Sequence, residues 1–269
     1  MKIEHISVSR GKSYKQCPYY YKLKYHEKIP NPGEEQFYFV YGKIIHKIAE
    51  CHVQEKGKRS LNEIANDVLR GKIEIEDGKK APPLPIDYKK RMPSHIRAIE
   101  KLNKSIGCDG ITEHKFKYDL QSPNGKFVTG FIDRIIIRDD KAWIIDYKTT
   151  KKGPFRENRH TVKYDPQLRI YSRVVQKEFG IDPLNIKAGL YYLEDEEVIS
   201  SSYDEDSLVR VEQELLEVYD TIFSHDPDQV VGTTGQHCQR CEYRDMCPFF
   251  KSSQRRVFWD GDLNKIPRT

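Results

Sequence analysis

An aspartate and a lysine stand two residues apart at the end of an apolar run, as Asp146 and Lys148 in the sequence AWIIDYKTT. Residues two apart on a strand leave the same face, so this carboxylate and this ammonium group are expected side by side. Two further acids, Asp133 and Glu113, lie in the two apolar runs that precede this one. If turns pair the three runs as antiparallel strands, all three carboxylates approach one another near the strand ends.

Carboxylates crowded in this way repel one another, and a divalent cation removes that cost. Oxygen ligands favour Mg²⁺ or Mn²⁺. A lysine beside such an ion can orient or deprotonate a water and can stabilise negative charge that develops on a phosphoryl group. The residue types therefore suit metal-assisted hydrolysis of a phosphodiester. The simpler alternative is a surface hairpin in which Asp146 and Lys148 form only a salt bridge, since an Asp-x-Lys pattern alone is a weak signal.

The order of the predicted elements indicates how these side chains are positioned. Helices are expected at 38–55, 59–70 and 88–106, strands at 111–120, 126–138 and 141–150, a crossover helix at 165–179, strands at 185–195 and 196–203, and a long amphipathic helix at 204–226. This order predicts an α/β fold in which a mixed central sheet is flanked by helices.

We expect one domain over residues 1–269. Its predicted parts are a helical part at 1–106 with a mobile insertion at about 71–91, a core at 107–225, and a cysteine-bearing tail at 226–269 that is tied to Cys17.

Composition excludes several classes of protein. The chain has 269 residues, of which 37% are hydrophobic, and it contains no apolar run long enough to span a membrane. The first residues lack the apolar stretch of a signal peptide, so a cytoplasmic protein is expected. The net charge of +5 permits a polyanionic partner without demanding one. Six cysteines in such a chain favour metal binding or redox chemistry over disulfides.

Several short motifs together resemble the PD-(D/E)XK nuclease superfamily, and within it the RecB/AddB-like branch. They are YGKIIH with Gly42 and His46, GFID with Asp133, IIDYKTT with Asp146 and Lys148, and QLRIY with Gln167 and Tyr171. The resemblance implies a restriction-endonuclease-like core and a bacterial, archaeal or virus-infected cell as the setting.

The resemblance also implies roles for these residues. His46, Asp133, Asp146 and the Tyr147 carbonyl would bind Mg²⁺ or Mn²⁺, and Lys148 would be the catalytic lysine. Glu113 matches an acid that is common on the first strand of this core. Predicted DNA contacts are made by Gln167 and Tyr171, four apart on one helical face, and by the basic residues Lys151, Lys152, Arg156 and Arg159.

Four of the cysteines form a separate pattern. Cys238, Cys241 and Cys247 are closely spaced, and Cys17 lies far away near the N-terminus. Four thiolates can hold a tetrahedral zinc ion or an iron–sulfur cluster. The arrangement resembles the iron–sulfur subgroup of the same nuclease branch, which implies a 4Fe–4S cluster, with structural Zn²⁺ as the alternative. Either would tie the two ends of the chain together, so metal binding would add to folding stability.

The function expected from this resemblance is a metal-dependent DNA nuclease. We expect an exonuclease that acts on single-stranded DNA or on DNA ends in recombination, repair or genome processing. One alternative is a CRISPR-adaptation nuclease subunit. Another is a non-catalytic DNA-binding subunit of a helicase–nuclease assembly, although such a protein would usually have lost Lys148 or an aspartate. The expected partners are therefore DNA and a helicase, recombination or CRISPR protein.

Overall fold

The computed structural model describes residues 5–30, 37–120, 122, 125–153 and 156–250 of the chain. Two compact units make up the protein. The first comprises Met1–Val8 and Gln36–Leu216, and the second comprises Ser9–Glu35 and Glu217–Thr269. None of the described helices is both long enough and apolar enough to cross a membrane.

The first unit is built on a mixed sheet with the order β1-β3-β4-β5-β6, and β2 pairs with the remaining edge of β3. The pairs β2–β3, β3–β4 and β5–β6 are antiparallel, whereas β1–β3 and β4–β5 are parallel. The strands are β1 (His5–Ile6), β2 (Ile111–Asp119), β3 (Phe127–Arg138), β4 (Lys141–Lys148), β5 (Ile186–Tyr192) and β6 (Glu197–Ser201). The three antiparallel strands expected around Asp133 and Asp146 are thus confirmed, and only the two-residue β1 was not predicted.

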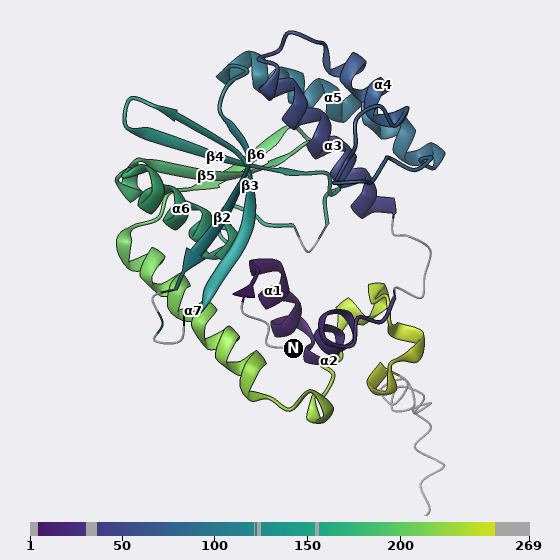
Figure 1. Ribbon diagram of the computed structural model, residues 1–269, viewed down its shortest axis with the longest axis vertical. Helices are drawn as coiled ribbons and strands as arrows, with labels where there is room; N and C mark the ends of the chain where they lie inside the picture. The colour runs from purple at the N-terminus through teal and green to yellow at the C-terminus, as the bar shows by residue number, and fades with distance from the viewer. Residues whose placement is uncertain (1–4, 31–36, 121, 123–124, 154–155, 251–269) are drawn as a thin grey trace, which may run out of the picture. The chain divides into compact units, whose positions relative to one another are not determined.

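Helices cover both faces of this sheet (Figure 1). On one side, α3 (Phe37–Gln54), α4 (Leu61–Leu69) and α5 (Ile86–Ile106) share one apolar core with side chains from β4 and β5. On the other side lie α6 (Pro166–Phe179) and α7 (Glu205–Ser224), joined by ion pairs such as Arg169–Glu214. The predicted α/β class, with a mixed sheet flanked by helices, is confirmed.

The segment expected as a mobile insertion is packed into this core. Its last residues belong to α5, which begins at Ile86 rather than near residue 88. The side chains of Ile75 and Leu84 are buried in the core formed by α3, α4 and α5. Two apolar anchors therefore hold the segment against the helices, although its sequence is rich in glycine, proline and lysine.

The second unit joins the two ends of the described chain. Its N-terminal part contains α1 (Val8–Gln16), α2 (Pro18–Tyr21) and a π-helical turn at Lys22–His26, and its C-terminal part contains short 3₁₀ turns. Lys22 pairs with Asp228 at 3.1 Å, and the Tyr243 hydroxyl donates to the Ile29 carbonyl at 2.9 Å. These contacts join residues about two hundred positions apart in sequence.

The start of α6 offers a test of how the sequence positions Gln167. Asp165 caps this helix, because its Oδ1 accepts hydrogen bonds from the backbone N–H groups of Gln167 and Leu168 at 2.8 and 2.9 Å. We predict that Asp165→Ala lowers the free energy of unfolding by about 1–2 kcal/mol, as loss of a helix cap does. Asp165→Asn keeps an oxygen acceptor, so its free energy of unfolding should fall much less. Urea unfolding measures both, and equal midpoints for Asp165→Ala and the wild type would contradict the assignment.

Candidate active site and metal centre

The site lies where β3 and β4 separate. The last paired residues of the two strands are Arg134 and Ile145, so the next positions along the strands are Asp133 and Asp146. There the ladder is replaced by a side-chain contact, since the backbone N–H of Tyr147 donates to Asp133 Oδ2 at 2.8 Å. The separation lets two carboxylates stand on neighbouring strands without a backbone bond between them.

Three potential metal ligands meet beside this opening. The ligand atoms of His46, Glu113 and Asp133 all lie within 4.8 Å of one another. His46 comes from α3, where its Nδ1 lies 3.4 Å from Asp133 Oδ2 and its Nε2 donates to the Tyr147 carbonyl at 2.9 Å. Helix α3 therefore delivers an imidazole to the two acids of β2 and β3, as the expected site requires.

Asp146 of β4 is held by contacts with Lys148 and with Gln167 of α6. Its Oδ2 lies 2.5 Å from Lys148 Nζ, and its Oδ1 accepts a hydrogen bond from Gln167 Nε2 at 2.9 Å. The same amide nitrogen donates to the Tyr171 hydroxyl at 2.7 Å. Tyr171 is only 6% exposed. The helix pair Gln167–Tyr171 therefore positions Asp146, and Tyr171 is too deeply buried in this structure to contact DNA as the sequence predicted.

Glu113 reaches the site through an unusual backbone. Its φ is +46°, in the left-handed region that non-glycine residues rarely adopt. The alternation of β2 breaks there, because Thr112 accepts from Gln54 of α3 while His114 contacts Glu178 of α6. Residues two apart on a regular strand would face the same layer. Local strain is thus concentrated at a residue of the candidate site, as is common where function demands a particular geometry.

Burial and mutual repulsion shift the pKa values of these groups. Burial and the nearby Asp133 raise the pKa of Glu113 to about 7. Burial raises the pKa of Asp146 and outweighs the attraction of Lys148. Burial alone would lower the pKa of His46, but the charge of Asp133 raises it to about 9. Asp146 likewise raises the pKa of Lys148 against the effect of burial. Protons thus neutralise part of the crowded negative charge.

These residues fit a divalent cation. Asp146 is buried, and its Oδ2 lies 2.5 Å from Lys148 Nζ, so the ammonium group is the charge that faces this oxygen. The ligand atoms of His46, Glu113 and Asp133 are a donor set of the kind that binds Mn²⁺ or Mg²⁺, and the charge of Asp146 acts on the same His46 and Asp133. A cation there would take over the neutralising role of the protons.

One residue that supports the site was not foreseen. Arg134 is fully buried, and its guanidinium donates to Asn103 Oδ1, the Tyr147 hydroxyl, and the carbonyls of Gly107 and Asp109. A buried cation without these acceptors would be costly. Arg134 therefore fixes the loop before β2 and the ring of Tyr147. Both lie next to the strands that carry the acids. A charge inside the apolar run IDRIII was the only signal in the sequence.

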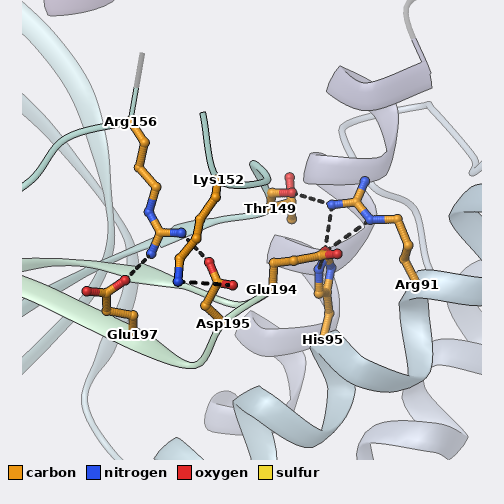
Figure 2. A network of polar contacts seen from close by, with 8 residues as sticks. All are labelled: Arg91, His95, Thr149, Lys152, Arg156, Glu194, Asp195 and Glu197. Carbon is orange, nitrogen blue, oxygen red and sulfur yellow. Dashed lines mark hydrogen bonds and ion pairs between the residues drawn. The ribbon is translucent and has the colours of Figure 1, made fainter. Parts of the chain in front are cut away.

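In the basic segment after Lys148, Arg156 is held by acids of the protein, whereas the other predicted DNA contacts are exposed. Arg156 has a side chain only 7% exposed, stacks on the Tyr192 ring at 3.7 Å, and pairs with Asp195 and Glu197. Figure 2 shows the pairing of Arg156 with Asp195 and Glu197, and Lys152 lies 3.8 Å from Asp195. Arg156 therefore holds the segment against the β5–β6 hairpin and is not available to a phosphate in this structure. The predicted DNA contacts Lys151, Lys152 and Arg159 are exposed.

The same hairpin also holds the end of β4. Glu194 accepts from Arg91 at 2.8 Å and from His95 Nε2 at 2.8 Å, and Arg91 donates to the Thr149 carbonyl at 2.7 Å (Figure 2). Burial lowers the pKa of His95, so the ring is neutral near pH 7. Because Thr149 follows Lys148, this network fixes the backbone that presents the lysine.

In the second unit, the four expected cysteines lie together. Cys17, Cys238, Cys241 and Cys247 line one small pocket. The backbone N–H groups of Tyr20 and Gly235 point at the sulfurs of Cys17 and Cys238, at 3.5 and 3.4 Å. Such bonds favour thiolates. Burial, with added repulsion from the other three cysteines, raises the pKa of Cys241.

The pKa values yield a test of the metal centre. The raised pKa values of Glu113 and His46 mean that the metal-free fold binds these protons more tightly than the unfolded chain does. Their contribution to stability is present at low pH and is lost as pH rises through about 7 and then about 9. A metal ion displaces the protons, so we predict that Mn²⁺ raises the melting temperature more at pH 8 than at pH 6.

Thermal unfolding in EDTA and in Mn²⁺ measures this difference across the pH range. Asp133→Asn retains the shape of the side chain but removes its charge, and should abolish the shift caused by Mn²⁺. An equal Mn²⁺ effect in the wild type and in Asp133→Asn would place the ion elsewhere.

Comparison with known proteins supports the same interpretation. The family model of the PD-(D/E)XK nuclease superfamily matches residues 5–248. A crystal structure of a "putative exonuclease" from Eubacterium rectale is similar over 89% of this chain and 88% of that one, with 16% identity and a TM-score of 0.52. This likeness indicates a shared fold. The structure of SSO0001 covers 86% of this chain and 93% of its own at 16% identity, with a TM-score of only 0.37. No curated protein matches the sequence.

Proposed function

Because the chain belongs to the PD-(D/E)XK nuclease superfamily, we propose that it is a metal-dependent deoxyribonuclease that hydrolyses phosphodiester bonds. The observation that carries the proposal is the meeting of His46, Glu113 and Asp133, with the Asp146–Lys148 pair on the strand next to Asp133. We propose further that it is an exonuclease acting on single strands or DNA ends. The likeness in fold to the Eubacterium rectale protein is compatible with this activity.

Each side chain has a role that follows from its position. His46, Glu113, Asp133 and Asp146, with the Tyr147 carbonyl, would hold Mg²⁺ or Mn²⁺, which when bound supplies positive charge to the scissile phosphate and acidity to a water. Lys148 lies on the same face as Asp146 and keeps its proton, so its ammonium group can stabilise the negative charge that develops on the phosphoryl oxygens. Gln167 holds the carboxylate of Asp146 in place for this arrangement.

A second candidate is a non-catalytic DNA-binding subunit of a helicase–nuclease assembly. The complete set of acids and the lysine favours the enzyme, since a binding subunit has no need for a buried, mutually repelling carboxylate cluster. Membership of the RecB/AddB-like branch, and a CRISPR-adaptation, recombination or repair role, rest on the motif from Gly42 to His46 and on the four cysteines. A motor or CRISPR protein would then be a partner.

Lys148→Ala tests the proposed activity. We predict that the wild type degrades end-labelled DNA in Mn²⁺ or Mg²⁺ and that Lys148→Ala loses at least 100-fold in rate, as expected when a group that stabilises the transition state is removed. Single strands and blunt duplexes labelled at either end compare substrates and polarity, and closed circles, which have no ends, test whether cleavage requires an end. Arg156→Ala is the matched control, because it removes a cation that is engaged by acids. Equal rates for the wild type and Lys148→Ala would contradict the proposed role.

For the second unit we propose a 4Fe–4S cluster bound by Cys17, Cys238, Cys241 and Cys247, with Zn²⁺ as the alternative. The four cysteines line one small pocket, and Cys17, Cys238 and Cys247 all act on Cys241, as expected of thiols that share one site. The cluster would link the two ends of the chain and stabilise the unit.

Metal analysis of protein purified without air tests this proposal. We predict about four irons per chain in the wild type, and loss of iron with lower solubility in Cys238→Ala. Cys108→Ala is the control, because that cysteine lies in the first unit beside His52. Zinc at one ion per chain with no iron would contradict the cluster and leave the nuclease proposal standing.

A further inference from the structure

Three large aromatic side chains are exposed along the cleft that contains the candidate active site. Tyr38, Phe39 and Phe131 have exposed fractions of 48, 49 and 51%. They line the same cleft as His46, Glu113 and Lys148. The rings of Tyr38 and Phe39 pack together at the start of α3, with their centroids 4.0 Å apart. Exposed apolar side chains that gather beside a cleft mark a binding surface, whereas those scattered singly over a surface do not.

Lysines lie next to the aromatic side chain on β3. Lys115 of β2 is the cross-strand partner of Phe131, so the two side chains share one face of the hairpin. Further from the acids, Lys117 extends over the ring of Phe127, with its Nζ 3.8 Å from the ring centroid. Both lysines are exposed. The β2–β3 hairpin (Figure 1) therefore carries two neighbouring pairs of a lysine and a phenylalanine, and Phe131 of one pair lines the cleft.

Two of the lysines that line the cleft are already engaged by acids. Lys43 pairs with Glu76 at 2.7 Å, and Lys47 pairs with Glu50 at 2.5 Å. By contrast, no acid pairs with Lys115 among the residues that the structure describes. A phosphate that approaches along β2 therefore finds an available cation at Lys115, whereas one at Lys43 must displace a carboxylate.

We propose that Phe131, Tyr38 and Phe39 stack against the unpaired bases of single-stranded DNA while Lys115 and Lys117 contact its phosphates. This inference rests on the proposed nuclease function, and it specifies the substrate as an unpaired strand that enters the site along the β2–β3 hairpin. Aromatic side chains can stack only on bases whose faces are open, and lysines alternating with aromatic groups are the chemistry of single-strand grooves. In a blunt duplex the base faces are covered by stacking within the helix, so these rings would not strengthen its binding.

Binding of a fluorescein-labelled oligothymidylate to the Lys148→Ala protein, followed by anisotropy, tests the proposal without cleavage. We expect Phe131→Ala to weaken binding about tenfold, as loss of one stacked base does. Phe131→Trp should retain affinity, and neither change should alter binding of a blunt duplex. Lys115→Ala should reduce the slope of log affinity against log salt by about 0.7 for the single strand.

Two controls separate stacking from other effects. Trp143→Ala removes a comparably exposed aromatic side chain of β4, which lines a different groove, and should leave oligothymidylate binding unchanged. An oligonucleotide of abasic sites keeps the phosphates but lacks bases, so Phe131→Ala should no longer weaken binding. Melting temperatures of the variants establish that each one folds.

The outcomes distinguish this inference from the nuclease proposal. Equal affinity of Phe131→Ala and its parent for the single strand, or an equal loss with the abasic strand, would overturn the stacking role even if the wild type cleaves DNA. Failure of the wild type to cleave any DNA, combined with single-strand binding that depends on Phe131, would reject the nuclease and retain the aromatic site. A tenfold loss of affinity in Phe131→Ala that is confined to strands with bases, together with cleavage by the wild type, supports both the stacking role and the nuclease proposal.

Discussion

The crowding of carboxylates at the point where β3 and β4 part is the constraint on which the structure of the first unit depends. Asp133 and Asp146 would face each other across a regular ladder, and neither can be ionised there without a partner. Each acid is therefore supported separately. Asp133 accepts the Tyr147 N–H and approaches His46, whereas Asp146 faces Lys148 and accepts from Gln167. A divalent cation is the group that would satisfy both at once.

The surrounding elements serve this constraint from two layers. Helix α3 brings His46 from one face of the sheet, and α6 brings Gln167 from the other. Arg134 fixes the start of β2 through backbone carbonyls, and Glu194 fixes Thr149 through Arg91. These contacts lie outside the site but determine the positions of the strands that carry it. Binding of a metal ion should therefore stabilise the whole first unit, because it relieves repulsion between elements that are otherwise rigidly held.

The sequence predicted the parts of this arrangement that depend on strand periodicity and turns. Asp146 and Lys148 share a face because they are two apart on β4, and the antiparallel order brings Asp133 beside them. Other features depend on tertiary contacts that no local pattern contains. Arg156 resembles a DNA-contacting residue until Asp195 and Glu197 are seen to engage it, and Tyr171 is buried by packing against Phe116. The left-handed backbone of Glu113 breaks the alternation on which strand prediction relies.

A crystal structure with Mn²⁺, located by its anomalous scattering, would show whether these residues form a metal centre. We expect an ion between His46, Glu113 and Asp133 that also contacts Asp146, with Lys148 beside it and no longer paired only with that carboxylate. An ion bound elsewhere, or a site that stays without metal under conditions in which the protein cleaves DNA, would contradict this expectation.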